Sequence, residues 1–173
     1  MAESVRTLLP ENAIVVDEGI SASSTFYKGL RDAAAHDWLH ITGGAIGIGL
    51  PLATGAAVAR RDRKVVCLQA DGSALYTVQA LWTMARENLD VTTVILDNRT
   101  YATLIGELAK VGAGNAGRRA LDMMSLDRPA IGWPELARSF GVEGTRVDTL
   151  DAFNAAFRAA MTTRGPSLIA VSL

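Results

Sequence analysis

The fold is decided by the stretch Lys64-Val65-Val66-Cys67-Leu68-Gln69-Ala70-Asp71-Gly72-Ser73, which joins an apolar run to an acidic turn. The apolar run predicts a buried strand, and a second such run, Thr92 to Asp97, ends at Asn98. The residues between the two runs suffice for one helix, so the strands are expected to be parallel neighbours. Their carboxyl ends would then meet at one edge of a sheet, which is where ligands of open α/β sheets bind.

The same alternation of β-rich runs and helical periodicity continues along the chain. It predicts strands at Ala13–Asp17, Lys64–Ala70, Thr92–Asp97, Glu143–Val147 and Ser167–Val171, with Trp38–Thr42 as a candidate sixth. It predicts helices at Ala2–Leu9, Ile46–Arg60, Val78–Glu87, Trp133–Gly141 and Leu150–Thr162, the last capped by Asp148 or Thr149. This pattern is typical of an α/β fold, a parallel sheet of five or six strands with helices on both faces.

Length and composition favour a single domain over residues 1–173, because 49% hydrophobic residues supply a sizeable core. The charges, 17 basic and 18 acidic, give no electrostatic footprint for nucleic acid or for an anionic membrane. The N-terminus lacks a signal-peptide pattern and no apolar run is long enough for a membrane span, so a cytoplasmic protein is expected. Cys67 lies inside an apolar run and is interpreted as an inert buried side chain.

The acidic turn has the chemistry of a metal and phosphate site. Asp71 and Asn98 offer the oxygen ligands that Mg²⁺ prefers, with phosphate oxygens completing the shell. Gly72 leaves room for a phosphate, and Ser73 falls in the first turn of the next helix, where free N–H groups favour an anion. Asp-Gly and Asp-Asn after strands are also ordinary turn chemistry, so each pair alone has a purely structural interpretation.

The combination of the two turns resembles a known pattern. Ala70-Asp71-Gly72-Ser73 through Leu96-Asp97-Asn98 is similar to the thiamine diphosphate motif, which begins Gly-Asp-Gly and ends Asn-Asn. The chain resembles the diphosphate-binding C-terminal domain of acetolactate synthases and benzoylformate decarboxylases over nearly its whole length. The stretches that carry the rest of the resemblance are Ser73–Arg86, Gly43–Pro51, Pro129–Val142 and Gly165–Ile169. The resemblance implies the thiamine diphosphate-binding fold, with thiamine diphosphate and Mg²⁺ as cofactors.

The resemblance also implies roles for individual residues. The metal would be held by Asp71, Asn98 and the main-chain carbonyl of Thr100. The diphosphate would lie beside four residues, Ser21, Gly72, Ser73 and Tyr101, the last through its backbone N–H. In the glycine-rich loop, the Gly44 carbonyl would accept a hydrogen bond from the 4'-amino group of the cofactor. Ile46 would wedge between the two cofactor rings, although packing at a helix start is the alternative role for that side chain.

Three residues depart from the family pattern. Ala70 replaces the first glycine of the motif, a change that only a backbone with ordinary φ tolerates. Asp97 replaces the first asparagine and adds a negative charge near the diphosphate, which Arg99 or the metal would have to offset. Ala102 stands where a glycine often follows the tyrosine, and its side chain would oppose a close approach of the backbone to the cofactor at this position.

The activity implied by the resemblance is acetolactate synthase-like cleavage or formation of a bond beside the carbonyl of a small 2-oxo acid. A benzoylformate-type decarboxylase is the alternative. In the family the catalytic glutamate comes from a pyrimidine-binding domain of the same or a neighbouring subunit of a homo-oligomer. Nothing in this sequence resembles that domain or the family's central domain. We therefore expect no catalytic residue in this chain, an inactive isolated chain, and a fragment or one subunit of a split enzyme.

Two interpretations come from other classes. A noncatalytic binding or assembly module would explain the Ala70 and Asp97 changes. A nicotinamide-binding domain would use the glycine-rich run Gly43–Pro51, but its glycines do not stand at the first, third and sixth positions that the fingerprint needs. Further along, Val111–Arg119 is interpreted as a mobile loop, either a lid or a surface connection, in which Arg118 and Arg119 are candidates for contact with an anionic substrate.

Overall fold

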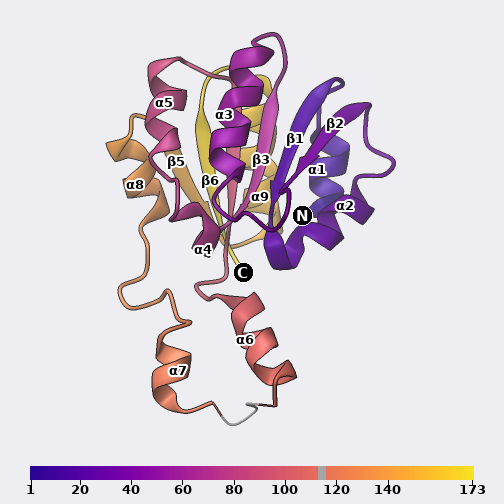
Figure 1. Ribbon diagram of the computed structural model, residues 1–173. Coiled ribbons are helices and arrows are strands. Elements are labelled where there is room, and N and C mark those ends of the chain that lie inside the picture. The colour runs from indigo at the N-terminus through magenta and orange to yellow at the C-terminus, as the bar shows by residue number, and fades with distance from the viewer. Residues whose placement is uncertain (113–115) are drawn as a thin grey trace.

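A six-stranded, all-parallel sheet lies between two layers of helices in the computed structural model, which describes residues 1–112 and 116–173 (Figure 1). The strands are β1 (Ala13–Glu18), β2 (His36–His40), β3 (Val65–Ala70), β4 (Val91–Asp97), β5 (Glu143–Val147) and β6 (Ser167–Ser172). They lie in the order β2-β1-β3-β4-β6-β5, and every neighbouring pair is parallel. The predicted α/β fold is therefore confirmed.

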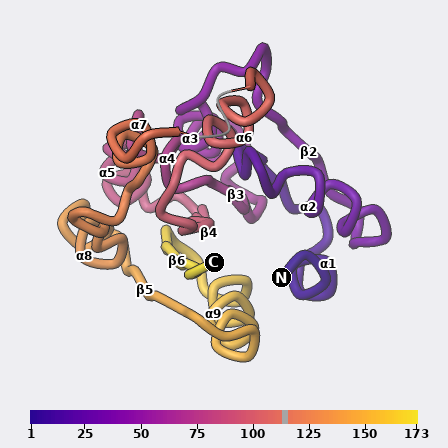
Figure 2. The backbone as a smooth tube through the Cα atoms, turned by 90° about the horizontal axis from the view of Figure 1, so that it is seen from below, coloured from indigo at the N-terminus to yellow at the C-terminus, as the bar shows by residue number. Residues whose placement is uncertain are grey.

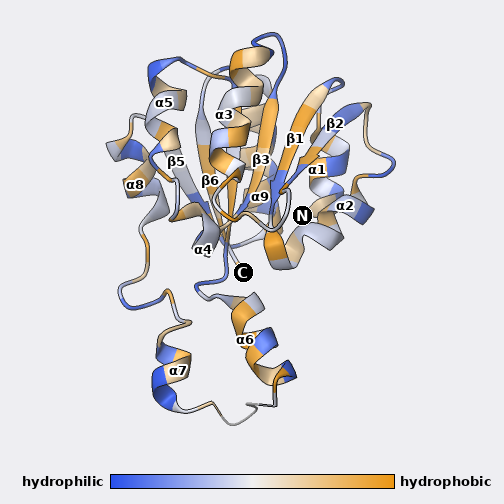
Figure 3. Ribbon diagram, viewed as in Figure 1, coloured by the Kyte–Doolittle hydropathy of each residue, from blue (hydrophilic) through white to orange (hydrophobic). Residues whose placement is uncertain are grey.

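The helices of the described residues are α1 (Ala2–Leu8), η1 (Ile20–Ala22), α2 (Ser23–Gly29), α3 (Gly49–Ala59), α4 (Asp71–Ala74), α5 (Ala80–Arg86), α6 (Ala102–Lys110), α7 (Arg118–Asp122), α8 (Trp133–Ser139) and α9 (Leu150–Thr162). One apolar core packs α3, α5 and α8 against the sheet, and a second packs α1, α2 and α9 against the other face. Figure 3 shows the central strands as the most hydrophobic part of the chain. Because both faces are covered, these strands are apolar throughout rather than alternating.

The carboxyl ends of the strands form the lower edge of the sheet in Figure 1. From this edge β1 continues into η1, β3 into α4, and β4 toward α6, while α6 and α7 extend away from the sheet (Figure 1). Seen from this edge in Figure 2, α1 and α9 lie on one side of the sheet and α3 and α5 on the other. The topology thus gathers loops from three central strands at one place.

The predicted strands agree with the observed ones to within one or two residues, including the candidate sixth, which runs over β2. The helix predicted from Ile46 begins only at Gly49, because Gly47 has a φ of 89° that an α-helix cannot continue. The sequence interpretation missed α2, whose Ser-Ser-Thr start has the composition of a loop. The cap prediction at Thr149 is confirmed, since its side chain accepts the Ala152 N–H at 3.2 Å.

The predicted loop over Val111–Arg119 is only partly a loop. Residues 113–115 lie outside the described residues, and the lid prediction falls partly on them. Arg118 begins α7 and pairs with Asp122, its Nε lying 3.6 Å from the carboxylate. Among the described residues, no helix is long and apolar enough to cross a membrane.

Candidate functional site

A cavity of about 440 Å³ opens at the carboxyl edge of the sheet, below the ends of β1, β3 and β4. It brings together eight of the nine residues to which the sequence interpretation gave a site role: Ser21, Ile46, Asp71, Gly72, Ser73, Asn98, Thr100 and Tyr101. Gly44 is not among the lining residues. Segments that are far apart in the sequence thus converge where the motif predicted a site.

Asp71 is the buried anion of this cavity. It is 2% exposed, and its two carboxylate oxygens accept the N–H groups of Gly72 at 2.8 Å and Arg99 at 2.6 Å. Burial raises the pKa of the Asp71 carboxyl to about 6, and the nearby Asp97 adds to this rise, while the two backbone hydrogen bonds oppose it. Among residues 1–112 and 116–173, no lysine, arginine or histidine forms an ion pair with Asp71.

Asn98 and Thr100 supply the neighbouring oxygens. The Asn98 side-chain oxygen accepts the Thr100 N–H at 3.0 Å, which fixes the amide in an Asx-type turn. Thr100 forms an isolated antiparallel β-bridge with Ser125. The hydrogen bonds of this bridge run from the Leu126 N–H to the Arg99 carbonyl and from the Tyr101 N–H to the Met124 carbonyl. Neither of these hydrogen bonds uses the Thr100 carbonyl, so the bridge leaves that oxygen available to a metal ion.

The donor set fits a magnesium ion bound to a diphosphate. Each carboxylate and amide oxygen has two lone pairs, and the bonds above occupy one on each of the Asp71 and Asn98 oxygens. Carboxylate, amide and carbonyl oxygens are the ligands of hard divalent cations. A buried carboxylate without a cationic partner is costly, and a bound cation would remove that cost.

Gly72 and Tyr101 pack together at the floor of the cavity. A Cβ atom on Gly72 would lie 2.5 Å from Tyr101 Cε1, so only glycine fits beneath this ring. The Tyr101 N–H donates to the Met124 carbonyl at 2.9 Å. The expected contact of that N–H with a diphosphate would therefore compete with this bond and stays a prediction, while Tyr101 itself lines the cavity.

Ser73 and Ser21 differ in how their hydroxyls are used. Ser73 lies in α4, the first turn after β3, as expected, and is buried. Its hydroxyl donates to the Ala70 carbonyl at 3.2 Å and accepts from Gln69 Nε2 at 2.7 Å. Its expected contact with a diphosphate would therefore compete with these internal bonds. Ser21 lies in η1 and lines the cavity.

The glycine-rich loop places Ile46 in the cavity wall with its side chain partly exposed. Gly44 has a φ of 69°, and its carbonyl accepts the Ile46 N–H at 3.0 Å in a tight turn. The expected hydrogen bond from that carbonyl to a cofactor amino group stays a prediction.

Asp97 is paired with Arg146 rather than with Arg99, which was one of the two partners, Arg99 or the metal, that the sequence suggested. Asp97 is 4% exposed, and its carboxylate accepts from Arg146 Nη1 at 2.6 Å. Arg146 comes from β5, two strands away, and also bonds Ser172 Oγ and the Ile131 carbonyl. Sequence reasoning missed Arg146 because the pairing depends on the strand order, which places β6 between β4 and β5.

The other two departures from the motif fit the structure. Ala70 has φ −71° and ψ 144°, an extended conformation that any residue adopts, so the missing glycine costs nothing there. Ala102 is the first residue of α6, where alanine is the most favourable helix former.

Several cavity residues carried no sequence signal. Ile20 follows β1 with a φ of 51°, an unusual conformation for a β-branched residue, and lines the wall beside Ser21. Leu104 and Met123 add apolar surface from α6 and from the turn after α7, and both are exposed. Their contribution depends on how α6 and α7 extend from the sheet, which periodicity does not predict.

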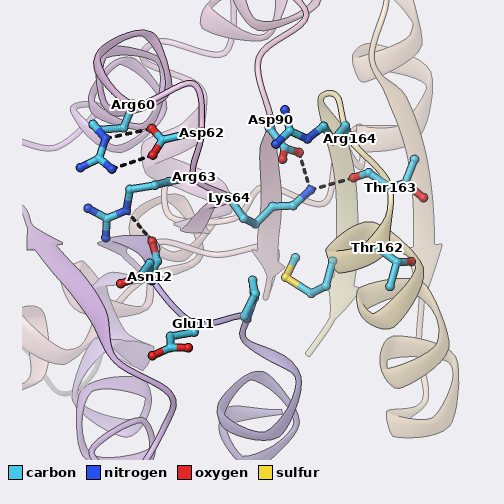
Figure 4. A pocket seen from close by; sticks show the side chains of 12 residues that line it. Glu11, Asn12, Arg60, Asp62, Arg63, Lys64, Asp90, Thr162, Thr163 and Arg164 are labelled. Carbon is cyan, nitrogen blue, oxygen red and sulfur yellow. Dashed lines mark hydrogen bonds and ion pairs between the residues drawn. The ribbon is translucent and has the colours of Figure 1, made fainter.

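A second cavity, of about 590 Å³, lies at the opposite edge of the sheet, and four of its charged side chains pair with one another (Figure 4). Arg60 pairs with Asp62, and Lys64 pairs with Asp90. Lys64 Nζ also donates to the Ala160 and Thr163 carbonyls, each at 2.8 Å, at the end of α9. These contacts give this cavity a structural role in holding α9 against the sheet. Cys67 is also inert, because full burial raises the pKa of its thiol.

The sequence pattern described as "Thiamine pyrophosphate enzyme, C-terminal TPP binding domain" matches residues 21–171. The chain belongs to this family. The family match removes the nicotinamide-binding alternative, and it agrees with the position of the cavity at the Asp71 and Asn98 turns.

Individual relatives agree with this assignment. The IlvX protein of Mycobacterium tuberculosis, provisionally named an acetolactate synthase large subunit, is 51% identical over 98% of this chain and 33% of that protein. A benzoylformate decarboxylase of Pseudomonas aeruginosa is 31% identical over 96% of this chain and 30% of that protein. The solved structure of the thiamine diphosphate-dependent 4-hydroxybenzoylformate decarboxylase of Rhodococcus jostii superposes with a TM-score of 0.86 at 35% identity. The superposition covers 99% of this chain and 31% of the Rhodococcus chain. The chain thus spans about a third of the length of these relatives.

Proposed function

We propose that this chain is the diphosphate- and magnesium-binding part of an acetolactate synthase-like enzyme that acts on small 2-oxo acids. The observation that carries the proposal is the buried Asp71 carboxylate, which has no cationic partner in the described residues and lies beside Asn98. A divalent cation bound to a diphosphate would balance this charge. Residues 1–173 would form one domain, with the family's pyrimidine-binding and central domains outside this chain.

The residues of the cavity would divide the work of binding. Asp71, Asn98 and the Thr100 carbonyl would hold Mg²⁺, and the Gly72 floor would leave room for the diphosphate. Ser21 and Ser73 would lie beside the diphosphate, Tyr101 would support it through its ring, and Ile46 and the Gly44 carbonyl would orient the rings. Bound thiamine diphosphate would supply the nucleophilic carbon and the electron sink for cleaving or forming a bond beside the carbonyl. This chain would contribute orientation, charge balance and a water-poor wall.

The proton chemistry requires a partner. None of the residues assigned above would transfer a proton, so a glutamate would come from a pyrimidine-binding domain of the same or a neighbouring subunit. The exposed apolar side chains of Ile46, Tyr76, Leu104 and Met123 around the cavity support this view. A second domain placed over them would bury this surface and exclude water from the reaction.

Two alternatives remain distinct in their predictions. A benzoylformate-type decarboxylase is favoured by the similarity to the Pseudomonas and Rhodococcus decarboxylases. A noncatalytic module would keep the fold and the cavity and lack turnover.

The test supplies the chain with a pyrimidine-binding domain, thiamine diphosphate and Mg²⁺, and measures carbon dioxide and acetolactate formed from pyruvate and from benzoylformate. Acetolactate formed from pyruvate supports the proposal, and carbon dioxide released only from benzoylformate supports the first alternative. No turnover despite Mg²⁺-dependent cofactor binding supports the noncatalytic module. Asp71→Ala is the matched control, since it should be inactive in every case.

A further inference from the structure

Glu18 is a fully buried carboxylate at the end of β1 that none of the roles above uses. It lies opposite Gln69 of β3 in the strand register, so the two side chains share the face of the sheet that α3 covers. A Cβ atom on Gly49 would lie within 3 Å of both side chains. Glu18 thus lies directly beneath the glycine-rich loop.

Both oxygens of Glu18 bind the backbone of that loop. Oε1 accepts the Gly47 N–H and Oε2 accepts the Gly49 N–H. In the part of the chain that the structure describes, no ion pair includes Glu18. The balancing charge comes instead from the helix, because Gly49 is the first residue of α3 and its N–H lies at the positive end of the helix dipole.

The loop is held from its other side as well. Thr77 Oγ1 donates to the Gly47 carbonyl at 2.7 Å. Gly47 has a φ of 89°, and a Cβ atom there would lie 2.7 Å from Tyr76 Cβ, so no other residue fits without strain. Gly47 is therefore fixed through both its N–H and its carbonyl, and the preceding residue is Ile46.

We propose that Glu18 is a positioning residue that fixes the place of Ile46 and of the Gly44 carbonyl against the ring portion of thiamine diphosphate. This inference rests on the proposed function. The diphosphate end has separate supports, Asp71 and Asn98, at the ends of β3 and β4. Loss of the Glu18 contacts should therefore weaken recognition of the rings and spare recognition of the diphosphate.

The two hydrogen bonds that Glu18 accepts from Gly47 and Gly49 explain why a carboxylate is needed at this position. Glu18→Gln has nearly the same volume, but its amide NH₂ would face one of two backbone N–H groups and lose that hydrogen bond. Glu18→Asp keeps the charge but, being shorter, reaches only one of the two groups. The two variants thus separate loss of charge from loss of reach.

The experiment compares two ligands on each variant. Magnesium pyrophosphate reports the diphosphate end alone, and thiamine diphosphate with Mg²⁺ reports both ends, each measured by calorimetric titration beside a thermal unfolding curve. We expect Glu18→Gln to weaken thiamine diphosphate binding about tenfold or more, because that is the effect of losing one buried hydrogen bond. Pyrophosphate affinity should stay within about twofold of the parent value. Glu18→Asp should fall between Glu18→Gln and the parent, and Glu11→Gln, exposed at the opposite edge, should match the parent for both ligands.

A second variant keeps the test decisive if Glu18→Gln does not fold. Thr77→Val removes the hydrogen bond to the other side of Gly47 and should show the same selective loss of thiamine diphosphate affinity. Equal losses for both ligands, or no loss for either, would overturn the positioning role. Failure of the parent chain to bind either ligand would instead reject the proposed function on which the inference rests.

Discussion

Removal of the Arg146 side chain should destabilise the domain through Asp97. The guanidinium lies 2.6 Å from a carboxylate that is 4% exposed, so Arg146→Met would leave that carboxylate buried beside Asp71 without a partner. Breaking a buried ion pair costs about 3–5 kcal/mol. Because the Arg146 side chain is 32% exposed, solvent would compensate part of this, and we expect a loss of about 2–3 kcal/mol.

Chemical and thermal unfolding of three variants measure this effect. For a domain of this size the loss corresponds to a Tm lower by roughly 5–10 °C. Asp97→Asn should restore most of the stability in the double variant, because it removes the unpaired charge. Cofactor binding should follow the same order, since an unpaired carboxylate beside the site repels a diphosphate. Additive losses in the double variant, or an Arg146→Met loss below about 0.5 kcal/mol, would refute the reasoning.

Three further changes test other parts of the account. Gly72→Ala should cost about 1–3 kcal/mol of stability and weaken cofactor binding, because the added Cβ would press on the Tyr101 ring. Gly55→Ala is the matched control, because a Cβ added there would meet no atom of another element within 4 Å. It should be neutral or stabilising in thermal unfolding. Because the pKa of Asp71 is about 6 and Mg²⁺ requires the ionised form, calorimetry should show Mg²⁺-dependent binding complete well above that pH and weakening as the pH falls below it; equal affinity on both sides would contradict the assignment. Lys64→Met should lower the free energy of unfolding by about 3–5 kcal/mol yet leave cofactor affinity unchanged in titrations, since its contacts lie at the opposite edge, and a loss of affinity in the folded variant would argue against that separation.

The sequence predicted the sheet well because its central strands are continuous apolar runs bounded by turns. Thr92–Asp97 is such a run, and its place beside β3 follows from the length of the segment between them. The Asp71 and Asn98 turns could be placed together for the same reason, since parallel strands bring their carboxyl ends to one edge.

The remaining features depend on tertiary structure. Arg146 reaches Asp97 only because β6 lies between their strands, and no local pattern records that order. The late start of α3 follows from the left-handed backbone of Gly47, which Glu18 and Thr77 hold from distant segments. The use of the Tyr101 N–H by Met124 likewise depends on the return of the chain after α7.

The central claim is that Asp71 holds a magnesium-bound diphosphate at this edge of the sheet. The measurement that tests it most directly is a calorimetric titration of thiamine diphosphate into the chain, with and without Mg²⁺, beside the Asp71→Ala variant. The account predicts binding that requires Mg²⁺ and that the variant abolishes while its fold is retained. Binding that is independent of Mg²⁺, or that survives in Asp71→Ala, would contradict it.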